Sequence, residues 1–319
     1  MTILDSLRFV QGAVATKDFI PVMTHFSINK LRIASYNGRI ALSSPIEFDI
    51  DCNPKAFPLI KAIGACEDQI KLSMTTAGKL AIKSGRFKAN IDCIEDASLL
   101  GVVPEGMEYN FEFSKLIEGF EKIAKFIGTD ASRPWSNGIL LHGQSIYATN
   151  NVCLVECWIG ENLPTINIPQ QAITEILRIK LIPINLRVSD TSASFIYSDD
   201  CWLRTQLLGA NWPDIQRIIN VDSSPIPIAP EFLKSVVKLK PFLSEDKQIH
   251  ITPGLISTHE NSQEGTSIEF DIQFSGIYNF DMLALLDNTM VSADFTTFPK
   301  PALFFGDNLR GAIVGVVKR

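Results

Sequence analysis

The fold is decided by the stretch Leu207-Leu208-Gly209-Ala210-Asn211-Trp212-Pro213-Asp214-Ile215-Gln216-Arg217-Ile218-Ile219. Leu207 and Leu208 are predicted to end an apolar strand, and Gly209 permits backbone angles that other residues resist. The residues at 212–214 then predict a rigid turn, because proline fixes φ and aspartate favours turn positions. Before this corner the chain passes twice through helix and hairpin patterns, and after it the same order begins a third time. The corner is therefore predicted to be a boundary between repeated domains.

Helical patterns of two kinds each occur three times. A helix of the first kind opens each third of the chain, and successive starts lie about 110 to 116 residues apart. A helix of the second kind follows a short strand and begins near Pro54, Pro169 or Asn279. Proline at a first helical position and asparagine at an N-cap are both signs of a helix start. The predicted helices span 4–15, 114–127 and 230–240 for the first kind, and 54–65, 169–179 and 279–286 for the second.

Turn dipeptides between these helices predict β-hairpins, with Asn-Gly as the strongest such pattern. The predicted turns are Asn37-Gly38, Ala77-Gly78, His142-Gly143, Asp190-Thr191-Ser192, Pro253-Gly254 and Phe298-Pro299. Each third then holds two helices and about seven or eight short strands, a period that indicates domains rather than solenoid repeats. We predict an α+β protein with three repeated domains at 1–105, 106–220 and 221–319, each with two helices packed on antiparallel sheets. The linkers are expected at 103–106 and 220–227.

The composition predicts a folded, soluble, cytoplasmic protein. Of the 319 residues, 46% are hydrophobic and 20% are charged. No apolar run reaches the roughly 18 residues that cross a bilayer, so we expect no membrane partner. The first eight residues lack the basic and small-residue pattern of an export signal.

The six cysteines predict reduced thiols rather than a disulfide framework or a metal site. They form no Cys-x-x-Cys pair, and only four histidines are present. Cys153 and Cys157 are four residues apart, but the segment 152–158 has the pattern of a buried strand. We therefore expect no metal and no cofactor, and reduced thiols fit a cytosolic protein.

The sequence contains no constellation for catalysis. It has no Gly-x-Ser-x-Gly motif and no glycine-rich loop before a helix, and its histidines fall in predicted hairpins or polar loops. We predict that the protein is not an enzyme.

Basic residues recur on the predicted helices although the net charge is −6. The local distribution of charge, not its sum, decides whether a protein binds DNA. The helix at 114–127 is predicted to bury Leu116, Phe120, Ile123 and Ile127. The helix at 230–240 is predicted to bury Phe232, Leu233, Val236 and Val237. The basic residues expected to face DNA are Arg8, Lys17, Lys55, Lys61, Lys115, Lys122, Lys125, Arg178, Lys180, Lys234, Lys238 and Lys240.

These lysines have two interpretations. Any solvated helix carries lysines, and Glu118 and Glu121 dilute the charge of the middle helix. If the repeats close a ring with helices inside, however, modest lysine counts add up to a positive lining. Lysine is a flexible point charge suited to sequence-independent phosphate contacts.

Several stretches, in the expected order, resemble bacterial DNA polymerase III β subunits, the sliding clamps. The corner at 207–219 resembles a joint of that family, and the resemblance spans nearly the whole chain. The other matching stretches are Ser84-Gly85-Arg86-Phe87-Lys88, Asn137-Gly138-Ile139-Leu140-Leu141, Ile146-Tyr147-Ala148-Thr149-Asn150, Ile168-Pro169 and Phe242-Leu243-Ser244-Glu245.

The resemblance implies a head-to-tail homodimer that forms a six-domain ring around double-stranded DNA, with strands outside and helices inside. Such a clamp is placed on DNA by a clamp loader, slides along it and tethers a DNA polymerase. The tether acts by raising effective concentration. The alternative is a β-rich three-repeat binding protein without a DNA role.

The resemblance also implies a groove for client peptides between the second and third domains. Carried over by position, its residues are Thr149, Asn151, Val152, Cys153, Leu154, Pro213, Arg217, Ile218, Ile313, Val314, Gly315, Val316 and Val317. Val152-Cys153 replaces the family's His-Arg pair, and Gly315-Val316-Val317 replaces its Met-Pro-Met ending. The groove is expected to stay apolar with a changed shape. The alternative is that these residues form only inter-domain core.

The dimer contact carries over to Phe242 and Leu243 on one protomer, facing Ala89 and Ile91 on the other. The small Ala89 stands where the family has a bulky aromatic residue, which is expected to weaken the contact. The chain also begins directly with a helix where the family has a strand. These departures predict a divergent, phage-encoded member.

Overall fold

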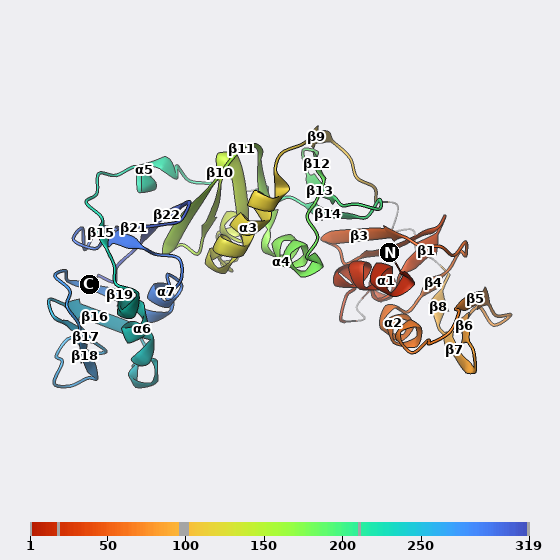
Figure 1. Cartoon of the computed structure of the whole chain (residues 1–319), viewed down its shortest axis with the longest axis horizontal. Helices are drawn as coiled ribbons and strands as arrows, with labels where there is room; N and C mark the ends of the chain where they lie inside the picture. Colours follow the sequence, from red (N-terminus) through yellow and green to blue (C-terminus); the bar gives the residue numbers. More distant parts are fainter. Residues whose placement is uncertain (1, 18–19, 96–101, 210–211, 318–319) are drawn as a thin grey trace. The chain divides into compact units, whose positions relative to one another are not determined.

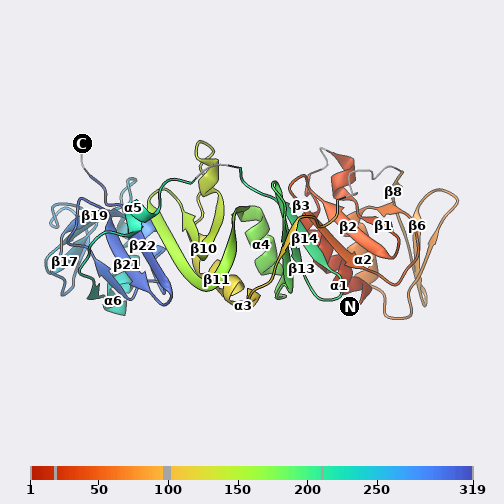
Figure 2. The same ribbon diagram turned by 90° about the horizontal axis from the view of Figure 1, so that it is seen from above.

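The computed structural model describes residues 2–17, 20–95, 102–209 and 212–317. It contains two compact units. Unit 1 comprises Met1–Ser114 and Gln171–Leu207, and unit 2 comprises Lys115–Gln170 and Leu208–Arg319. Figures 1 and 2 show the elements of each unit from two directions. Both units combine one end of the chain with part of its middle third.

The six predicted helices are confirmed within the described residues, and five of them end earlier than predicted. The first kind is shorter because its last turn tightens into 3₁₀ segments at Gln11–Ala13, Ala124–Phe126 and Lys240–Phe242, as is common at helix termini. The helices are α1 (Ile3–Val10), α2 (Ala56–Gly64), α3 (Phe113–Ile123), α4 (Gln170–Ile179), α6 (Pro230–Lys238) and α7 (Phe280–Ala284), with a short additional α5 (Gln216–Ile219).

Capping explains where several helices begin. Thr2 and Asp5 form a reciprocal capping box at α1. The side chain of Asn279 accepts a hydrogen bond from the backbone N–H of Met282, so the predicted N-cap of α7 is confirmed. The prediction that Pro54 and Pro169 occupy first helical positions is wrong. Each is the last residue of a strand, β4 or β11, and the helix begins one or two residues later.

Unit 1 is built on a seven-stranded antiparallel sheet that draws on two thirds of the chain. Its central pairing joins β3 to β14, with Leu42 opposite Leu203. The order across the sheet is β1 (Ser27–Asn29), β2 (Arg32–Tyr36), β3 (Ile40–Pro45), β14 (Trp202–Gln206), β13 (Ser192–Ile196), β12 (Asn185–Val188) and β9 (Met107–Tyr109). The first and middle thirds of the chain therefore share one sheet.

Two smaller sheets complete unit 1. One contains β5 (Lys71–Met74), β6 (Leu80–Ser84) and β7 (Phe87–Ile91) in that order, so β7 is an edge strand. The other pairs β4 (Asn53–Pro54) with β8 (Cys93–Ile94).

Unit 2 repeats this plan with a six-stranded sheet, in which β11 pairs with β22 and so joins the middle and last thirds. The order is β10 (Gly138–Thr149), β11 (Cys153–Pro169), β22 (Leu309–Ile313), β21 (Ala302–Gly306), β20 (Ser292–Asp294) and β15 (Ile226–Pro227). A second sheet has the order β18 (Ser267–Glu269), β17 (Leu255–Ser257), β16 (Gln248–Thr252) and β19 (Gly276–Asn279).

Five of the six predicted hairpin connections are confirmed, and the one at His142-Gly143 is wrong. Gly143 lies inside the continuous strand β10, where the pairing with β11 shifts register on both sides of it. Its φ of +60° is accommodated as a bulge rather than a turn. The chain turns instead between Thr149 and Cys153.

The cores follow the predicted helix faces with one exception. The stripe from Leu116 to Ile127 on α3 and its 3₁₀ extension is buried. Gly119 lets α3 approach the sheet, since a Cβ there would lie 2.8 Å from both Ile146 and Ile159. On α6 the prediction for Val237 is wrong, because that side chain is 43% exposed. Leu239 fills the buried position instead.

The predicted corner coincides with a change of unit. The strand before it, β14, ends at Gln206, two residues earlier than predicted. Leu207 donates a backbone hydrogen bond to Thr191 in unit 1, and Leu208 donates one to Asn167 in unit 2. Ala210 and Asn211 lie outside the described residues. The three-domain division stays a prediction.

Candidate functional site

The candidate site starts at the turn between β10 and β11. The side-chain oxygen of Asn150 accepts hydrogen bonds from the backbone N–H groups of Val152, at 3.1 Å, and Cys153, at 2.7 Å. Asn151 has a φ of +70°, a left-handed conformation that asparagine tolerates. The Thr149 hydroxyl donates to the carbonyl oxygen of Cys153 at 2.7 Å. These bonds make the turn a rigid wall.

A groove with a volume of about 310 Å³ lies beside this turn, wholly within unit 2. Most of its lining is apolar, which suits a site for a short peptide or a small apolar ligand. The lining residues are Arg133, Trp135, Thr149, Asn151, Val152, Cys153, Leu154, Trp212, Pro213, Ile215, Ile218, Pro301, Ala312 and Val314.

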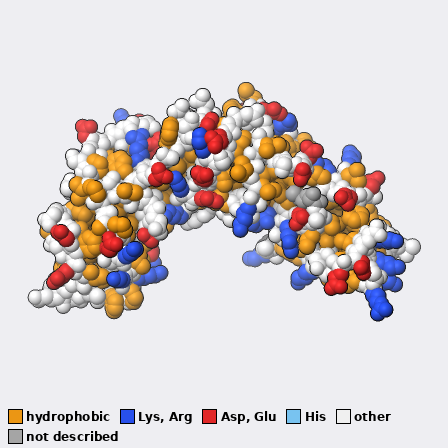
Figure 3. Space-filling model, viewed as in Figure 1, with side chains coloured by type: hydrophobic (Ala, Val, Ile, Leu, Met, Phe, Trp, Pro, Cys, Tyr) orange, Lys and Arg blue, Asp and Glu red, His pale blue; other side chains and the backbone are white. Residues whose placement is uncertain are grey.

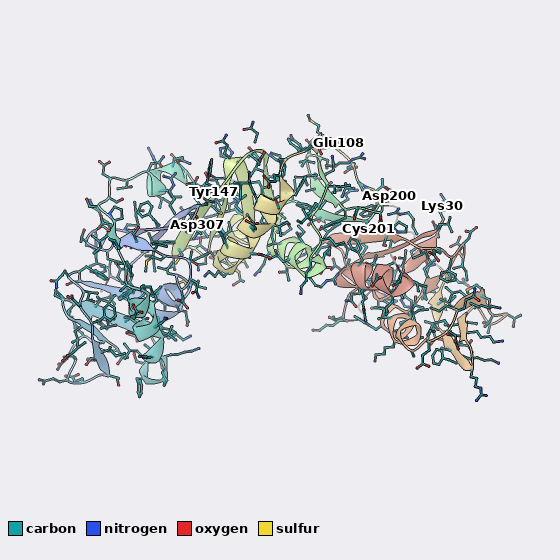
Figure 4. All side chains as sticks on the ribbon, in the orientation of Figure 1. Lys30, Glu108, Tyr147, Asp200, Cys201 and Asp307 are labelled. Carbon is teal, nitrogen blue, oxygen red and sulfur yellow. The ribbon has the colours of Figure 1, made fainter. Side chains whose placement is uncertain are left out.

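The segment after Trp212 forms one side of the groove by packing on the sheet. Leu154 of β11 and Ile215 belong to one buried cluster together with Leu140, Tyr147 and Ile219, and Trp212 packs against it. Figure 4 labels Tyr147, which is a member of this cluster. The predicted turn at 212–214 thus leads into α5, whose apolar residues anchor the groove wall to β10 and β11.

Two tryptophans give the groove an aromatic wall. The rings of Trp135 and Trp212 meet edge-to-face with centroids 5.2 Å apart. The indole nitrogen of Trp212 and the side-chain oxygen of Asn151 are buried and have no hydrogen-bond partner. A buried donor and acceptor without partners are costly unless a ligand satisfies them. Both atoms are therefore unpaired polar groups inside the groove wall.

Cys153 lines the groove as a neutral thiol. Burial raises its pKa to about 12, and burial likewise raises the pKa of Cys157 to about 11. Both lie on the same face of β11 and are buried, as the sequence predicts for a strand. Within the described part of the chain, no group of three or more His, Cys, Asp or Glu side chains is placed to hold a metal ion.

The structure brings together eight of the thirteen predicted groove residues. These are Thr149, Asn151, Val152, Cys153, Leu154, Pro213, Ile218 and Val314. Arg217 is not among the lining residues: its side chain is 85% exposed and pairs with Asp214 at 3.5 Å.

The C-terminal residues predicted for the groove also fall partly inside and partly outside its lining. Ile313 is buried in β22, and Gly315 packs against Phe298. Val316 donates a backbone hydrogen bond to Ile277, and Val317 is exposed. Only Val314 of this segment lines the groove.

Sequence reasoning missed six lining residues: Arg133, Trp135, Trp212, Ile215, Pro301 and Ala312. Tryptophan is enriched in binding sites, and the chain has only four, so Trp135 and Trp212 carried a usable sequence signal. Pro301 and Ala312 carried none, because only the pairing of β21, β22 and β11 brings them to the groove.

The lysines of α3 and of the 3₁₀ segment that follows it are bonded within their own unit. Lys115 pairs with Glu161 at 3.6 Å, and Lys122 pairs at 3.3 Å with Asp307, which Figure 4 labels. The amine of Lys125 donates to the carbonyl oxygen of Asp287 at 3.1 Å, and burial lowers its pKa. These contacts reduce the charge that α3 presents to a polyanion.

The other predicted basic residues differ in exposure and bonding. Arg178 donates to both carboxylate oxygens of Glu175 and to the carbonyl oxygen of Phe9, so its charge is compensated within unit 1. The remaining predicted residues are exposed: Arg8, Lys17, Lys55, Lys61, Lys180, Lys234, Lys238 and Lys240. Figure 3 shows basic and acidic side chains on the surface of each unit.

The predicted dimer residues fall on an edge strand and on a helix end. Ala89 and Ile91 belong to the edge strand β7, but the Ile91 side chain is buried within unit 1 opposite Leu80. Phe242 is 57% exposed at the end of a 3₁₀ segment, and Leu243 beside it is half-buried. Ile91 is thus available to a partner only through its backbone.

Comparison with solved structures identifies the fold. The chain is similar to Caulobacter crescentus pol III beta, with 18% identity, a TM-score of 0.85, and coverage of 99% of this chain and 98% of that one. It is similar to the Pseudomonas aeruginosa DnaN sliding clamp bound to griselimycin, with 15% identity, a TM-score of 0.84 and coverage of 99% and 97%. It is also similar to the Helicobacter pylori beta clamp bound to a DNA ligase peptide, with 18% identity, a TM-score of 0.80 and coverage of 99% and 98%.

The whole chain therefore has the fold of the bacterial DNA polymerase III β sliding clamps, and the α+β prediction is confirmed. No protein-family model matches the chain, and no curated protein sequence matches it. No helix among the described residues has the length and apolar character needed to span a membrane.

Proposed function

We propose that this protein is a DNA sliding clamp that tethers a DNA polymerase and other clients through the groove of unit 2. The observation that carries the proposal is the match of its fold to sliding clamps over 99% of the chain. The apolar groove beside α5 supports it, since the similar Helicobacter pylori clamp is a complex with a DNA ligase peptide. The protein performs no chemistry in this proposal.

The proposal includes a head-to-tail homodimer with six domains, at 1–105, 106–220 and 221–319 of each copy, that encircles double-stranded DNA. The edge strand β7 supports it, because an unpaired strand edge is a template for pairing with another chain. The exposed Phe242 offers an apolar contact. A clamp loader places the ring on DNA in the cytoplasm, and the departures in sequence fit a phage-encoded member.

The proposed DNA contacts are weak and independent of sequence. The exposed Lys234 and Lys238 lie four residues apart on α6 and thus on one face of that helix. Each phosphate contact adds salt dependence but no base specificity. Because the α3 lysines are already bonded to their own unit, we expect α6 to contribute more to DNA contact than α3.

The decisive experiment is loading on nicked circular DNA. A sliding clamp is retained on circles by topology and is lost when the circles are linearised. Failure of retention would leave the β-rich binding protein without a DNA role as the interpretation. Retention that survives linearisation would show DNA binding that does not depend on a closed ring, and it would contradict the clamp. Sedimentation equilibrium gives an independent check, because a ring requires a particle of twice 35.4 kDa.

The groove is tested by Ile218→Asp. Ile218 lines the groove and is 37% exposed, so a charge there is tolerated by the fold. We expect loss of polymerase binding with an unchanged dimer. Unchanged polymerase binding would contradict the groove as the client site.

A further inference from the structure

The sheet face that carries the groove continues past it. In the paired strands, Leu154 lies opposite Thr149 on one side and Ala312 on the other, and all three line the groove. Side chains of alternate residues share one face of a sheet, so Glu156 and Trp158 follow Leu154 on this face. The face therefore has three successive rows along β11, at Leu154, Glu156 and Trp158.

The second row is a hydrogen-bonded ion pair. The Tyr147 hydroxyl donates to one carboxylate oxygen of Glu156 at 2.9 Å, and Arg310 Nε donates to the other at 2.5 Å. Glu156 is buried, while the Arg310 side chain is 37% exposed. Because both oxygens of Glu156 are engaged, Arg310 is held in place with further N–H donors left for a ligand.

The third row exposes an aromatic ring. Trp158 is 56% exposed, although its backbone N–H is fixed by a 2.8 Å hydrogen bond to Asn308. A Cβ at Gly160 would lie 3.3 Å from the indole, so the ring rests close to this glycine. A hollow of about 430 Å³ is lined by Glu156, Trp158, Phe305, Asn308, Leu309 and Arg310. An exposed tryptophan beside an arginine is typical of a binding surface rather than of solvated sheet.

We infer that this hollow, the Trp158 shelf, is a second contact for the same client peptide that seats in the groove. The inference rests on the proposed function of the groove. It is supported by the position of the groove and the Trp158 shelf on one continuous sheet face. The occupant is an extended segment with an apolar residue in the groove, a carboxylate near Arg310 and an aromatic ring on Trp158. A carboxylate matches the free arginine donors, and aromatic rings favour edge-to-face contact.

The geometry fixes the spacing in that peptide. Successive rows are two residues apart along β11, or about 7 Å at a strand rise of roughly 3.4 Å per residue. An extended peptide advances at nearly the same rate. The carboxylate is therefore expected two residues from the groove residue, and the aromatic residue four residues from it.

The test uses random 12-residue peptides displayed on phage and selected on the full chain, then synthesised with a fluorescein label for anisotropy titration. We expect selected peptides to carry an acidic residue and an aromatic residue at the stated spacing. Trp158→Ala should weaken their binding about tenfold, the effect of about 1.4 kcal/mol. Trp158→Phe should restore most of it, and replacing the peptide's acidic residue by its amide should weaken binding to the wild-type chain.

The matched control is Ile226→Ala, which truncates another exposed apolar residue, 49% exposed, on β15 of the same sheet. It should leave affinity unchanged. Peptides that lose binding with Ile218→Asp but not with Trp158→Ala overturn the shelf and leave the groove standing. Peptides insensitive to Ile218→Asp contradict the groove itself, and with it the shared peptide.

Discussion

Gly12→Ala tests how α4 is fixed to the end of α1 in unit 1. Gly12 lies in the 3₁₀ segment after α1, and a Cβ there would lie 1.8 Å from a carboxylate oxygen of Glu175. Glu175 is buried, and Arg178 Nε donates to its two oxygens at 2.8 and 2.9 Å. The added methyl must displace this carboxylate, because a contact of 1.8 Å is far below van der Waals distance.

The expected loss follows from the bonds that are broken. Hydrogen bonds to charged groups contribute about 1.5–3 kcal/mol each. Water compensates part of the lost hydrogen-bond energy, because the Arg178 side chain is 35% exposed. We therefore expect a loss of about 2–3 kcal/mol in the free energy of unfolding, or about 6–9 °C in the melting temperature of a unit of this size. Calorimetry measures it.

The control is Gly64→Ala in α2, where a Cβ would meet nothing within 4 Å, so no loss is expected. A double-mutant cycle with Glu175→Ala isolates the cause. In that background Gly12→Ala should cost less than about 0.5 kcal/mol, because the obstructing carboxylate is gone. Equal losses in both backgrounds, or none in the wild-type chain, would refute the reasoning.

Three further predictions concern acid stability, DNA binding and packing. Burial raises the pKa of Asp294, but its hydrogen bonds outweigh burial and place the pKa below the usual 3.8. Its ionised form therefore stabilises the fold above pH 3.8, and this stabilisation is lost as the pH falls below that value. The melting temperature of Asp294→Asn should consequently fall less than that of the wild type below pH 3.8. The double variant Lys234→Gln, Lys238→Gln should bind duplex DNA with a weaker salt dependence. Measured by anisotropy, the slope of the logarithm of the binding constant against the logarithm of the salt concentration should fall by up to about 1.8. An unchanged slope would exclude these lysines from DNA contact. In Gly311→Ala the Cβ would lie 2.5 Å from the carbonyl oxygen of Leu154, a backbone atom that cannot rotate away. Calorimetry should therefore show that unit 2 is destabilised by about 1–3 kcal/mol. An unaltered unfolding transition would contradict this packing.

Much of the fold was predictable because it depends on local pattern. The stripe on α3 and the Asn37-Gly38 hairpin arise within a few turns or strand residues, where periodicity and turn chemistry decide the conformation. The wrong prediction of a hairpin turn at His142-Gly143 also comes from local pattern. A glycine with positive φ suits a turn or a bulge equally, and only the partner strand β11 selects the bulge.

The candidate site was predictable only in part. Leu154 and Ile218 were found through the resemblance, and the structure places both in the groove. Arg217 was predicted with them, yet it lies outside the lining because its side chain turns to solvent beside Asp214. Trp135 is a residue type that is enriched in binding sites, but only the tertiary structure brings it from a different segment against Trp212 at the groove.

The sequence by itself determined the repeating order of helices and hairpins and the corner at 207–219, because these follow from residue type and short-range spacing. Only the tertiary structure decided that β3 pairs with β14 and β11 with β22, so that the thirds of the chain share sheets instead of being joined by linkers alone. Such pairings join residues more than 150 positions apart. Their backbone hydrogen bonds are the same for every residue type, so the choice of partner strand leaves little trace in the local sequence.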